Sequence, residues 1–438
     1  MTRDMSSPAP ADPSLSLSPV TRHPLQLIRA RYLLPTAGVP AIEDGALLIV
    51  SGRIAAVGSY STLQDSGAEV IDYGDAVILP PLVNAHCHLE LTDFPQWTTE
   101  CGETILPTSF VDWIRRLIRV RRAIGTDPVP ASVTAGIRHL LTSGTGAVGD
   151  ILTTPGALAP LLASPLYGRI FFETIGLDEE RYVPALKSAL ASARSLACPL
   201  GGGVSPHSTY TVSSRHLEKA ISTGLPLAIH CAESPEESTF LREGRGPIAA
   251  ELYAAAGWPL PEDAPGLSPV AWLAAHGALN AQTLLIHGVQ VDAEDASIIA
   301  ASGATVVLCP RSNARLGVGI APVGLYKKAG VALALGTDSR ASNDSLSLWE
   351  EIAFARSVYP ELSPGELLAI ATCGGARALG LEREMGALTV GSGAHLQVLS
   401  AATLPPVEEL AAWLCGAEHQ VAALWLGGIE RLRQDVPC

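Results

Sequence analysis

The sequence predicts an α/β fold, a (β/α)8 TIM barrel with a small β-sandwich domain built from both chain ends. Its 438 residues, 47% of them hydrophobic and 16% charged, suffice for one large barrel and an appended domain. In the middle of the chain, short apolar runs alternate with longer helical patterns, as in repeated βα units. Segments of β type, separated by turn residues, stand at both ends.

The chain divides into three parts. Residues 1–22 are rich in Pro and Ser and lack an apolar stretch, which predicts a disordered leader. Residues 23–78 contain the β-type segments LQLIRARYLLP, GALLIVSGRIAAVG and AEVIDYG, and residues 386–438 contain GALTVGSGAHLQVLSA and QVAALWLGG. We expect these two ends to form the β-sandwich domain and residues 79–385 to form the barrel.

Eight candidate barrel strands follow one another, with helical text between most of them. They are 76–88, 144–152, 168–176, 201–208, 225–233, 283–289, 305–313 and 331–339. Eight such units favour a closed barrel. The long segment 234–282 follows the fifth strand, and we expect it to form part of a lid.

Composition argues against nucleic acid and membranes as partners, and we expect a small-molecule substrate. The net charge is −14 without a basic run, which argues against nucleic acid and anionic membranes. No run reaches the roughly 18 apolar residues of a membrane span. Eight cysteines without a CxxC pair predict reduced thiols and a cytoplasmic protein. A homodimer is the assembly expected of such a barrel.

Polar residues stand at the ends of nearly all the candidate strands. A lone histidine at such a place is more often a core residue than a ligand. In a barrel, however, the carboxyl ends of the strands converge on one mouth, where active sites lie. Their coincidence therefore predicts one site built from His86, His88, Glu173, His207, His230, Glu233, His287, Arg311 to Asn313, and Asp338.

Part of this set predicts a metal centre. His86, His88, His230 and Asp338 make three nitrogen ligands and one oxygen ligand, which leaves a position for water. No lysine occurs on a candidate strand to supply a bridging carbamate, so we expect one divalent metal rather than two. Zn²⁺ and Fe²⁺ both suit these ligands.

The neighbouring groups suggest hydrolysis. Asp338 could accept the proton of a metal-activated water molecule. Glu233 lies three residues after His230 and could move a proton to a leaving amine, whereas the plain alternative is a surface loop acid. His287 could polarise the reacting oxygen or orient the water.

The motifs VNAHCHLE, SPHSTYTVS, HCAES, LIHGV, CPRSNARLGVG and ALGTDSRASNDSLSLWEEI resemble the amidohydrolase superfamily. They are most similar to its mononuclear adenosine-type deaminases, with chlorohydrolase and cytosine deaminase relatives. The resemblance implies a barrel with a β-sandwich, one Zn²⁺ or Fe²⁺, and hydrolytic deamination. It implies metal ligands at His86, His88, His230 and Asp338, a proton shuttle at Glu233, an orienting group at His287 and a sugar contact at His207.

A narrower resemblance rests on HCHLE and SFVDWIRRLIRVRR (109–122), which look like the aminodeoxyfutalosine deaminases of menaquinone synthesis. These act on a nucleoside that bears a benzoate. The resemblance suggests that Glu90 and Glu173 hold sugar hydroxyls, that Arg311 meets a carboxylate, and that Trp113 contacts substrate. The alternatives are that Arg311 pairs with Asp338 and that 109–122 is an ordinary amphipathic helix.

Two other functions stay open. The same site could release chloride or hydrolyse an amide or cyclic C–N bond, although Glu233 favours ammonia because an amine leaves well only when protonated. A non-catalytic barrel would have lost a ligand, and none is missing. One departure from the superfamily pattern is His395, which stands where members usually carry Asp; we expect it to affect a structural contact rather than chemistry.

Overall fold

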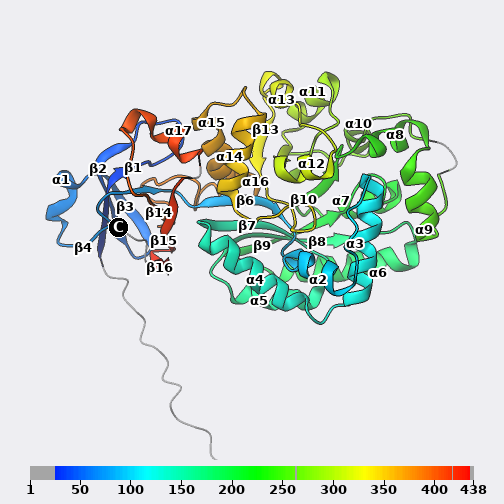
Figure 1. Cartoon of the computed structure of the whole chain (residues 1–438), viewed down its shortest axis with the longest axis horizontal. Coiled ribbons are helices and arrows are strands. Elements are labelled where there is room, and N and C mark those ends of the chain that lie inside the picture. Colours follow the sequence, from blue (N-terminus) through cyan, green and yellow to red (C-terminus); the bar gives the residue numbers. More distant parts are fainter. Residues whose placement is uncertain (1–24, 262–263, 417, 435–438) are drawn as a thin grey trace, which may run out of the picture.

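The computed structural model describes residues 25–261, 264–416 and 418–434. The expected leader, 1–22, lies outside these ranges. Two sheets dominate the fold, a barrel of parallel strands and a separate mixed sheet made from both chain ends (Figure 1). The predicted fold class is confirmed. The division into domains at about residues 78 and 386 stays a prediction.

Eight parallel strands form the barrel in sequence order. They are β6 (Leu82–Cys87), β7 (Thr145–Leu152), β8 (Tyr167–Thr174), β9 (Leu200–Pro206), β10 (Leu227–Cys231), β11 (Thr283–His287), β12 (Thr305–Leu308) and β13 (Ala332–Leu335). The backbone N–H groups of Thr337 and Asp338, just past β13, donate to the carbonyl oxygen of His86 on β6 at 3.1 and 3.2 Å. These bonds join the last strand to the first.

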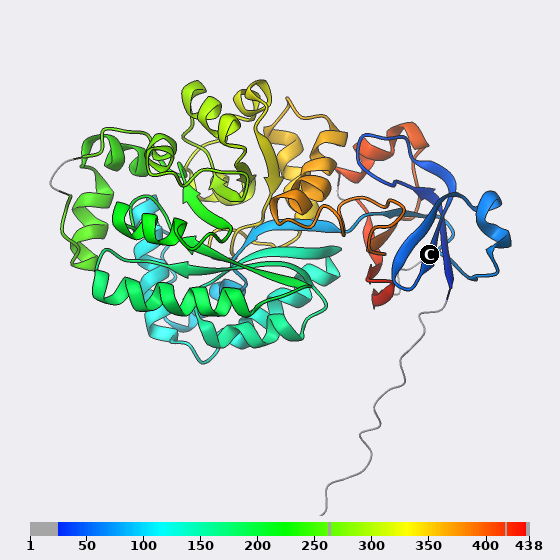
Figure 2. The same ribbon diagram turned by 180° about the vertical axis from the view of Figure 1, so that it is seen from behind.

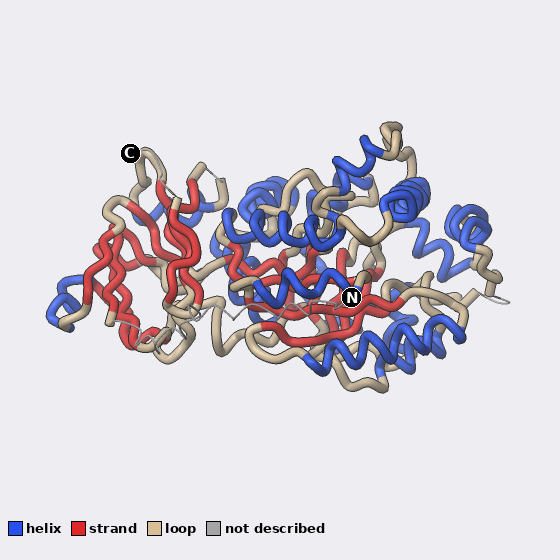
Figure 3. The backbone as a smooth tube through the Cα atoms, turned by 90° about the horizontal axis from the view of Figure 1, so that it is seen from below, coloured by secondary structure: helices blue, strands red, loops and turns tan. Residues whose placement is uncertain are grey.

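Helices surround the barrel strands, as Figure 3 shows. They include α4 (Val129–Thr142), α5 (Leu158–Ala163), α6 (Glu179–Ser195), α7 (Ser214–Ile221), α8 (Pro235–Glu243), α10 (Pro269–Ala275), α11 (Ala293–Ser302), α13 (Val323–Ala329), α14 (Leu348–Val358), α15 (Pro364–Ala369) and α16 (Gly375–Ala378). Inside the barrel, β-branched and small residues of facing strands pack together, such as Val83, Ala147, Ile286 and Val307. This filled interior leaves the ends of the strands as the place for a site.

The second sheet joins the two chain ends. Its strands are β1 (Gln26–Leu33), β2 (Ile42–Val50), β3 (Arg53–Ser59), β4 (Glu69–Asp72), β5 (Ala76–Leu79), β14 (Leu396–Ser400), β15 (Gln420–Leu426) and β16 (Ile429–Arg433). The antiparallel pair β5–β14 connects the early strands to the late ones. One buried cluster, with Ile28, Leu47 and Trp425 among its members, lies within this sheet.

Two expected strands differ from the sequence-based prediction, one because it is divided and one because it ends early. The segment 76–88 splits at Pro80–Pro81 into β5 and β6, which belong to different sheets (Figure 2). The cause is that proline cannot donate to a strand ladder. The segment 305–313 is a strand only to Leu308, because Pro310 begins helix α12 (Pro310–Leu316). Within the described residues, no helix is both long and apolar enough to cross a bilayer.

Candidate active site

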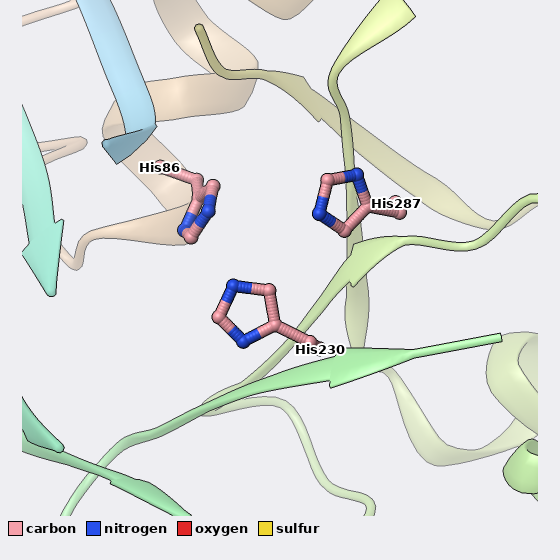
Figure 4. A group of neighbouring side chains, drawn as sticks. All are labelled: His86, His230 and His287. Atoms are coloured by element: carbon pink, nitrogen blue, oxygen red, sulfur yellow. The ribbon is translucent and has the colours of Figure 1, made fainter. Parts of the chain in front are cut away.

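Five polar side chains meet at the carboxyl ends of three strands and the loop after β13. His86 is the last residue but one of β6 and His88 directly follows that strand, while His230 and His287 lie on β10 and β11. Asp338 lies in a parallel bridge with Cys87, which brings it beside β6. Figure 4 shows the rings of His86, His230 and His287 arranged around a common space.

The ring nitrogens and the carboxylate lie close enough to share one ion. The Nε2 atoms of His88 and His230 are 3.3 Å apart. Asp338 Oδ1 lies 3.5 Å from His86 Nε2 and 3.7 Å from His88 Nε2. Two overlapping groups, His86–His230–His287 and His86–His88–Asp338, each keep their ligand atoms within 4.8 Å of one another. The four predicted ligands are therefore brought together, with His287 beside them.

Hydrogen bonds from the surrounding chain orient these groups. Nδ1 of His230 lies 3.0 Å from the carbonyl oxygen of His207, so this nitrogen donates and Nε2 keeps a lone pair. The hydroxyls of Ser312 and Ser342 donate to Asp338 Oδ2 at 2.7 and 2.6 Å. Oδ1 is thereby left to face His86 and His88. Each predicted ligand thus presents an atom with a free electron pair.

The donor set fits a transition metal. Both ring nitrogens of His86 are buried and have no hydrogen-bond partner among the described residues, which is costly unless something else binds them. Burial first, and then the charge of neighbouring His86, lowers the pKa of His88 to about 3. Neutral imidazole is the form that binds metal. Three imidazoles and one carboxylate are typical ligands of Zn²⁺ or Fe²⁺.

Glu233 and His287 lie side by side next to the predicted metal ligands.

 The Oε1 atom of Glu233 lies 3.4 Å from His287 Nε2, and both side chains are buried. Burial first, and then the charge of Asp338, raises the pKa of Glu233 well above its usual range, which favours the protonated form of its carboxyl group. Burial lowers the pKa of His287 to about 4, so its imidazole is neutral. An acid and a base are thus adjacent at the site.

The backbone is strained where these side chains leave their strands. Ala232, His287 and Asp338 have positive φ angles of 54°, 74° and 55°, a region that residues other than glycine rarely adopt. The carboxylate of Glu237 stabilises the first of these turns, since it accepts from the backbone N–H of Glu233 at 2.8 Å. Such strain persists only where the surroundings hold it, and it is typical of functional sites.

A cavity of about 410 Å³ lies next to the predicted metal ligands. Its floor includes His88, His230 and Asp338, and its apolar wall comes from helix α3 (Phe110–Ile124). No described residue of 234–282, the segment expected to form part of a lid, lines this cavity. These residues fold into α8, a π-helical turn (Ile248–Tyr253), α9 (Ala254–Ala256) and α10, and their role as a lid stays a prediction.

Four of the five expected substrate contacts line this cavity, namely Glu90, Trp113, Glu173 and His207. Both carboxylate oxygens of Glu90 accept from backbone N–H groups, those of Thr153 and Thr154, at 2.7 and 2.8 Å. Glu173 Oε2 accepts from the hydroxyl of Thr153, while its Oε1 is buried without a partner among the described residues. Glu173 therefore retains a free acceptor.

Arg311 is not brought to the cavity. It lies on α12, and its guanidinium pairs with Asp344 and Glu350. Neither a substrate carboxylate in this cavity nor Asp338 is its partner, so both sequence-based interpretations of Arg311 disagree with the structure. The reason is that Pro310 starts a helix, which carries the side chain outward from the strand end.

Four residues hold the site in roles that the sequence did not assign. Ser312 and Ser342 hold Asp338, Asn313 contacts His287, and Glu237 holds the turn before α8. Ser312 and Asn313 belong to the predicted set 311–313, whereas Ser342 and Glu237 were not singled out, and their proximity to the quoted motifs was the available signal. Cysteines 87, 231 and 309 are buried, and burial raises the pKa of each thiol, which agrees with a packing role.

Comparison with known proteins identifies the family. The profile of the Amidohydrolase family matches residues 77–422. The chain is 36% identical to an aminodeoxyfutalosine deaminase of Deinococcus radiodurans over 357 residues, which cover 78% of this chain and 82% of that protein. It is 29% identical to a 5-methylthioadenosine/S-adenosylhomocysteine deaminase of Halobacterium salinarum over 392 residues, which cover 84% and 83% of the two chains.

A solved structure has the same fold. The crystal structure of an adenosine deaminase from Xanthomonas campestris with bound zinc superposes with a TM-score of 0.78 at 25% identity, and the match covers 94% of each chain. The family match extends over both the strand-end histidines and the barrel that carries them. The chain belongs to the amidohydrolase family and is a hydrolase of non-peptide carbon–nitrogen bonds, of the deaminase type.

Proposed function

We propose that this protein is a metal-dependent deaminase that hydrolyses an amino-purine nucleoside to the oxo-purine nucleoside and ammonia. The observation that carries the proposal is the contact between Glu233 Oε1 and His287 Nε2, 3.4 Å apart, in the wall of the cavity that His88, His230 and Asp338 also line. A proton donor at this place suits an amine leaving group, because ammonia must be protonated as it departs.

The metal site of the proposal uses His86, His88, His230 and Asp338, with one Zn²⁺ or Fe²⁺. A divalent metal bound there supplies the nucleophile by lowering the pKa of a water molecule toward neutrality. Asp338 Oδ1 is the acceptor for the proton that this water gives up, because Oδ2 is already occupied by Ser312 and Ser342. The free Oδ1 faces the same space as the ring nitrogens.

Glu233 performs the proton transfers on the substrate side. Its protonated carboxyl donates to a purine ring nitrogen, which makes the neighbouring amino-bearing carbon electrophilic. The resulting carboxylate takes the proton of the hydroxyl group that has been added to this carbon and passes it to the leaving amine, and the proton held by Asp338 then restores the acid form of Glu233. His287, held by Asn313 through Nδ1, directs Nε2 toward the reacting oxygen and orients it.

The sugar of the nucleoside is placed beside Glu173 and His207. Glu173 Oε1 has no partner among the described residues and can accept from a sugar hydroxyl. Burial raises the pKa of Glu173 to about 7, so it can also donate. The finer expectation is that the substrate is aminodeoxyfutalosine, which would place the enzyme in menaquinone synthesis; the 36% identical relative of that name supports it.

The test combines metal analysis with a substrate screen. Purified protein is expected to contain about one Zn or Fe per chain and to release ammonia from at least one amino-purine nucleoside, with aminodeoxyfutalosine the best substrate. Adenosine, 5-methylthioadenosine and S-adenosylhomocysteine complete the panel. A metal-loaded enzyme that releases no ammonia from any of them would refute deamination and favour the release of chloride or the cleavage of an amide. Full activity without metal would refute the metal site.

A further inference from the structure

Helix α3 carries five arginines, and among them only Arg121 has a buried side-chain nitrogen without a hydrogen-bond partner in the described part of the chain. Arg115 pairs with Glu251, and Arg119 pairs with Glu103. Arg116 donates to the backbone oxygen of Glu103. Each of these three arginines therefore has an acceptor within the protein.

Arg121 has no acidic partner within 4 Å in the part of the chain that the structure describes. Its Nη2 atom donates to the hydroxyl of Thr154 at 3.0 Å, which fixes the side chain. Its Nη1 atom is buried and has no hydrogen-bond partner there. A buried cationic donor without an acceptor is costly, because its hydration is lost without replacement. The missing acceptor is therefore expected to come from a ligand.

The position of Arg121 indicates which part of a ligand it meets. It lines the same cavity as His88 and Glu233, together with Arg122, Gly125 and Thr126 at the end of α3. The other cavity-lining residues of α3, namely Trp113, Ile114, Leu117 and Ile118, make an apolar wall. The other charged residues that line the cavity are Glu90, Glu173, Glu233 and Asp338, all acidic. Positive charge is thus confined to the end of α3.

We infer that Arg121 recognises a carboxylate on the substrate, joined by an apolar spacer to the sugar end of the nucleoside. The inference rests on the proposed function and names its substrate class. A guanidinium presents parallel N–H groups that match the two oxygens of a carboxylate. The apolar wall suits an aromatic or aliphatic spacer, since such a group is favourably removed from water there. Arg122, which is exposed, adds positive charge at the rim.

A different role for Arg121 would be to balance the charge of Glu173, whose pKa it lowers against the larger effect of burial. The two roles predict different results. An arginine that only neutralises Glu173 acts on all nucleosides alike. An arginine that binds a carboxylate acts on carboxylated substrates alone.

The experiment measures kcat/KM for three nucleosides with the metal-loaded enzyme: aminodeoxyfutalosine, its methyl ester and 5-methylthioadenosine. Arg121→Met is expected to lower kcat/KM for the carboxylate by roughly 10- to 100-fold, mainly through KM, because a charged hydrogen bond is lost. It should leave the ester and methylthioadenosine within about twofold. Arg121→Lys should recover part of the loss, and Arg115→Met is the matched control on the same helix.

An equal loss for all three nucleosides in Arg121→Met, or no loss for the carboxylate, would overturn the inference and leave the proposed function intact. Absence of ammonia from all three with wild-type enzyme would instead refute the proposed function. Thermal melting of each variant separates misfolding from altered recognition, since a folded Arg121→Met protein must still deaminate the ester.

Discussion

The Nδ1 atom of His287 lies 2.9 Å from the Oδ1 atom of Asn313, and both residues are buried. The contact requires Nδ1 to donate, which leaves Nε2 without its proton and directed toward Glu233. The amide thus fixes both the tautomer and the direction of the imidazole. Asn313 is a positioning residue, because it reaches the reaction only through His287.

The first prediction follows from this contact. Asn313→Ala is expected to lower kcat by roughly 10- to 100-fold, the usual effect of losing a partner that orients such a group. KM and metal content should change little, since the ligands are untouched. Steady-state kinetics and metal analysis check this. The control is Asn280→Ala, at an exposed asparagine in the turn before β11. If Asn313→Ala has a kcat as high as that of this control, Asn313 does not position His287.

The second prediction concerns the metal. His230→Ala is expected to bind less than half of the wild-type metal and to have no measurable deaminase activity, because one of four ligands is lost. Chelation should lower the Tm of the wild-type protein, since a metal that binds only the folded state stabilises it. The Tm of His230→Ala should not respond to chelator. His276→Ala, at the residue just after α10, is the control and should behave as wild type. If His230→Ala keeps the full metal content, His230 is not a ligand.

Much of this architecture could be predicted because hydrophobic periodicity marks strands and helices, and because a barrel brings strand ends together. The histidines at 86, 88, 230 and 287 stand next to apolar runs, so their convergence needed no knowledge of loops. Arg311 could not be placed, because its direction depends on whether a strand or a helix follows Cys309. Proline at 310 favoured the helix, a local effect that strand periodicity does not reveal.

The groups that hold the site were harder to predict for a different reason. Ser312 and Ser342 donate to one carboxylate oxygen from separate loops. Short polar side chains of this kind are common in loops, and sequence spacing does not tell which of them bond to a distant residue. Arg121 was equally hidden, since a basic residue near the end of a helix usually interacts with the helix dipole alone.

The third prediction concerns the contact between the second sheet and the barrel. Gln397 on β14 is buried; its Nε2 donates to the carbonyl oxygen of Pro80 at 2.9 Å, and its Oε1 accepts from Trp349 Nε1 at 3.3 Å. Gln397→Ala should lower the free energy of unfolding by about 1–3 kcal/mol, because buried polar groups lose their partners. Urea denaturation checks this, with exposed Gln64→Ala as the control. Metal content and KM should not change. If Gln397→Ala and wild type have equal free energies of unfolding, Gln397 does not stabilise the contact between the sheet and the barrel.

The fourth prediction concerns His395, the residue found where aspartate is usual in the superfamily. Its ring is buried, lies 4.4 Å from that of Tyr167, and accepts through Nδ1 from the backbone N–H of Gly427 at 3.2 Å. It therefore serves a structural contact between β14 and the turn after β15. Burial first, and then the charge of Arg53, lowers the pKa of His395 to about 4.

This depressed pKa makes stability depend on pH in a definite direction. Unfolded histidine titrates near pH 6.5, so between about pH 6.5 and 4 the unfolded chain binds the proton more strongly, and the contribution of His395 is lost as pH falls. The full loss is about 3 kcal/mol. His395→Asn keeps an acceptor for Gly427 but does not titrate, so its stability relative to wild type should improve progressively from pH 7 to pH 4 in denaturant titrations. His276→Asn is the control. If the difference in the free energy of unfolding between wild type and His395→Asn stays constant over this range, burial of His395 does not govern the acid response.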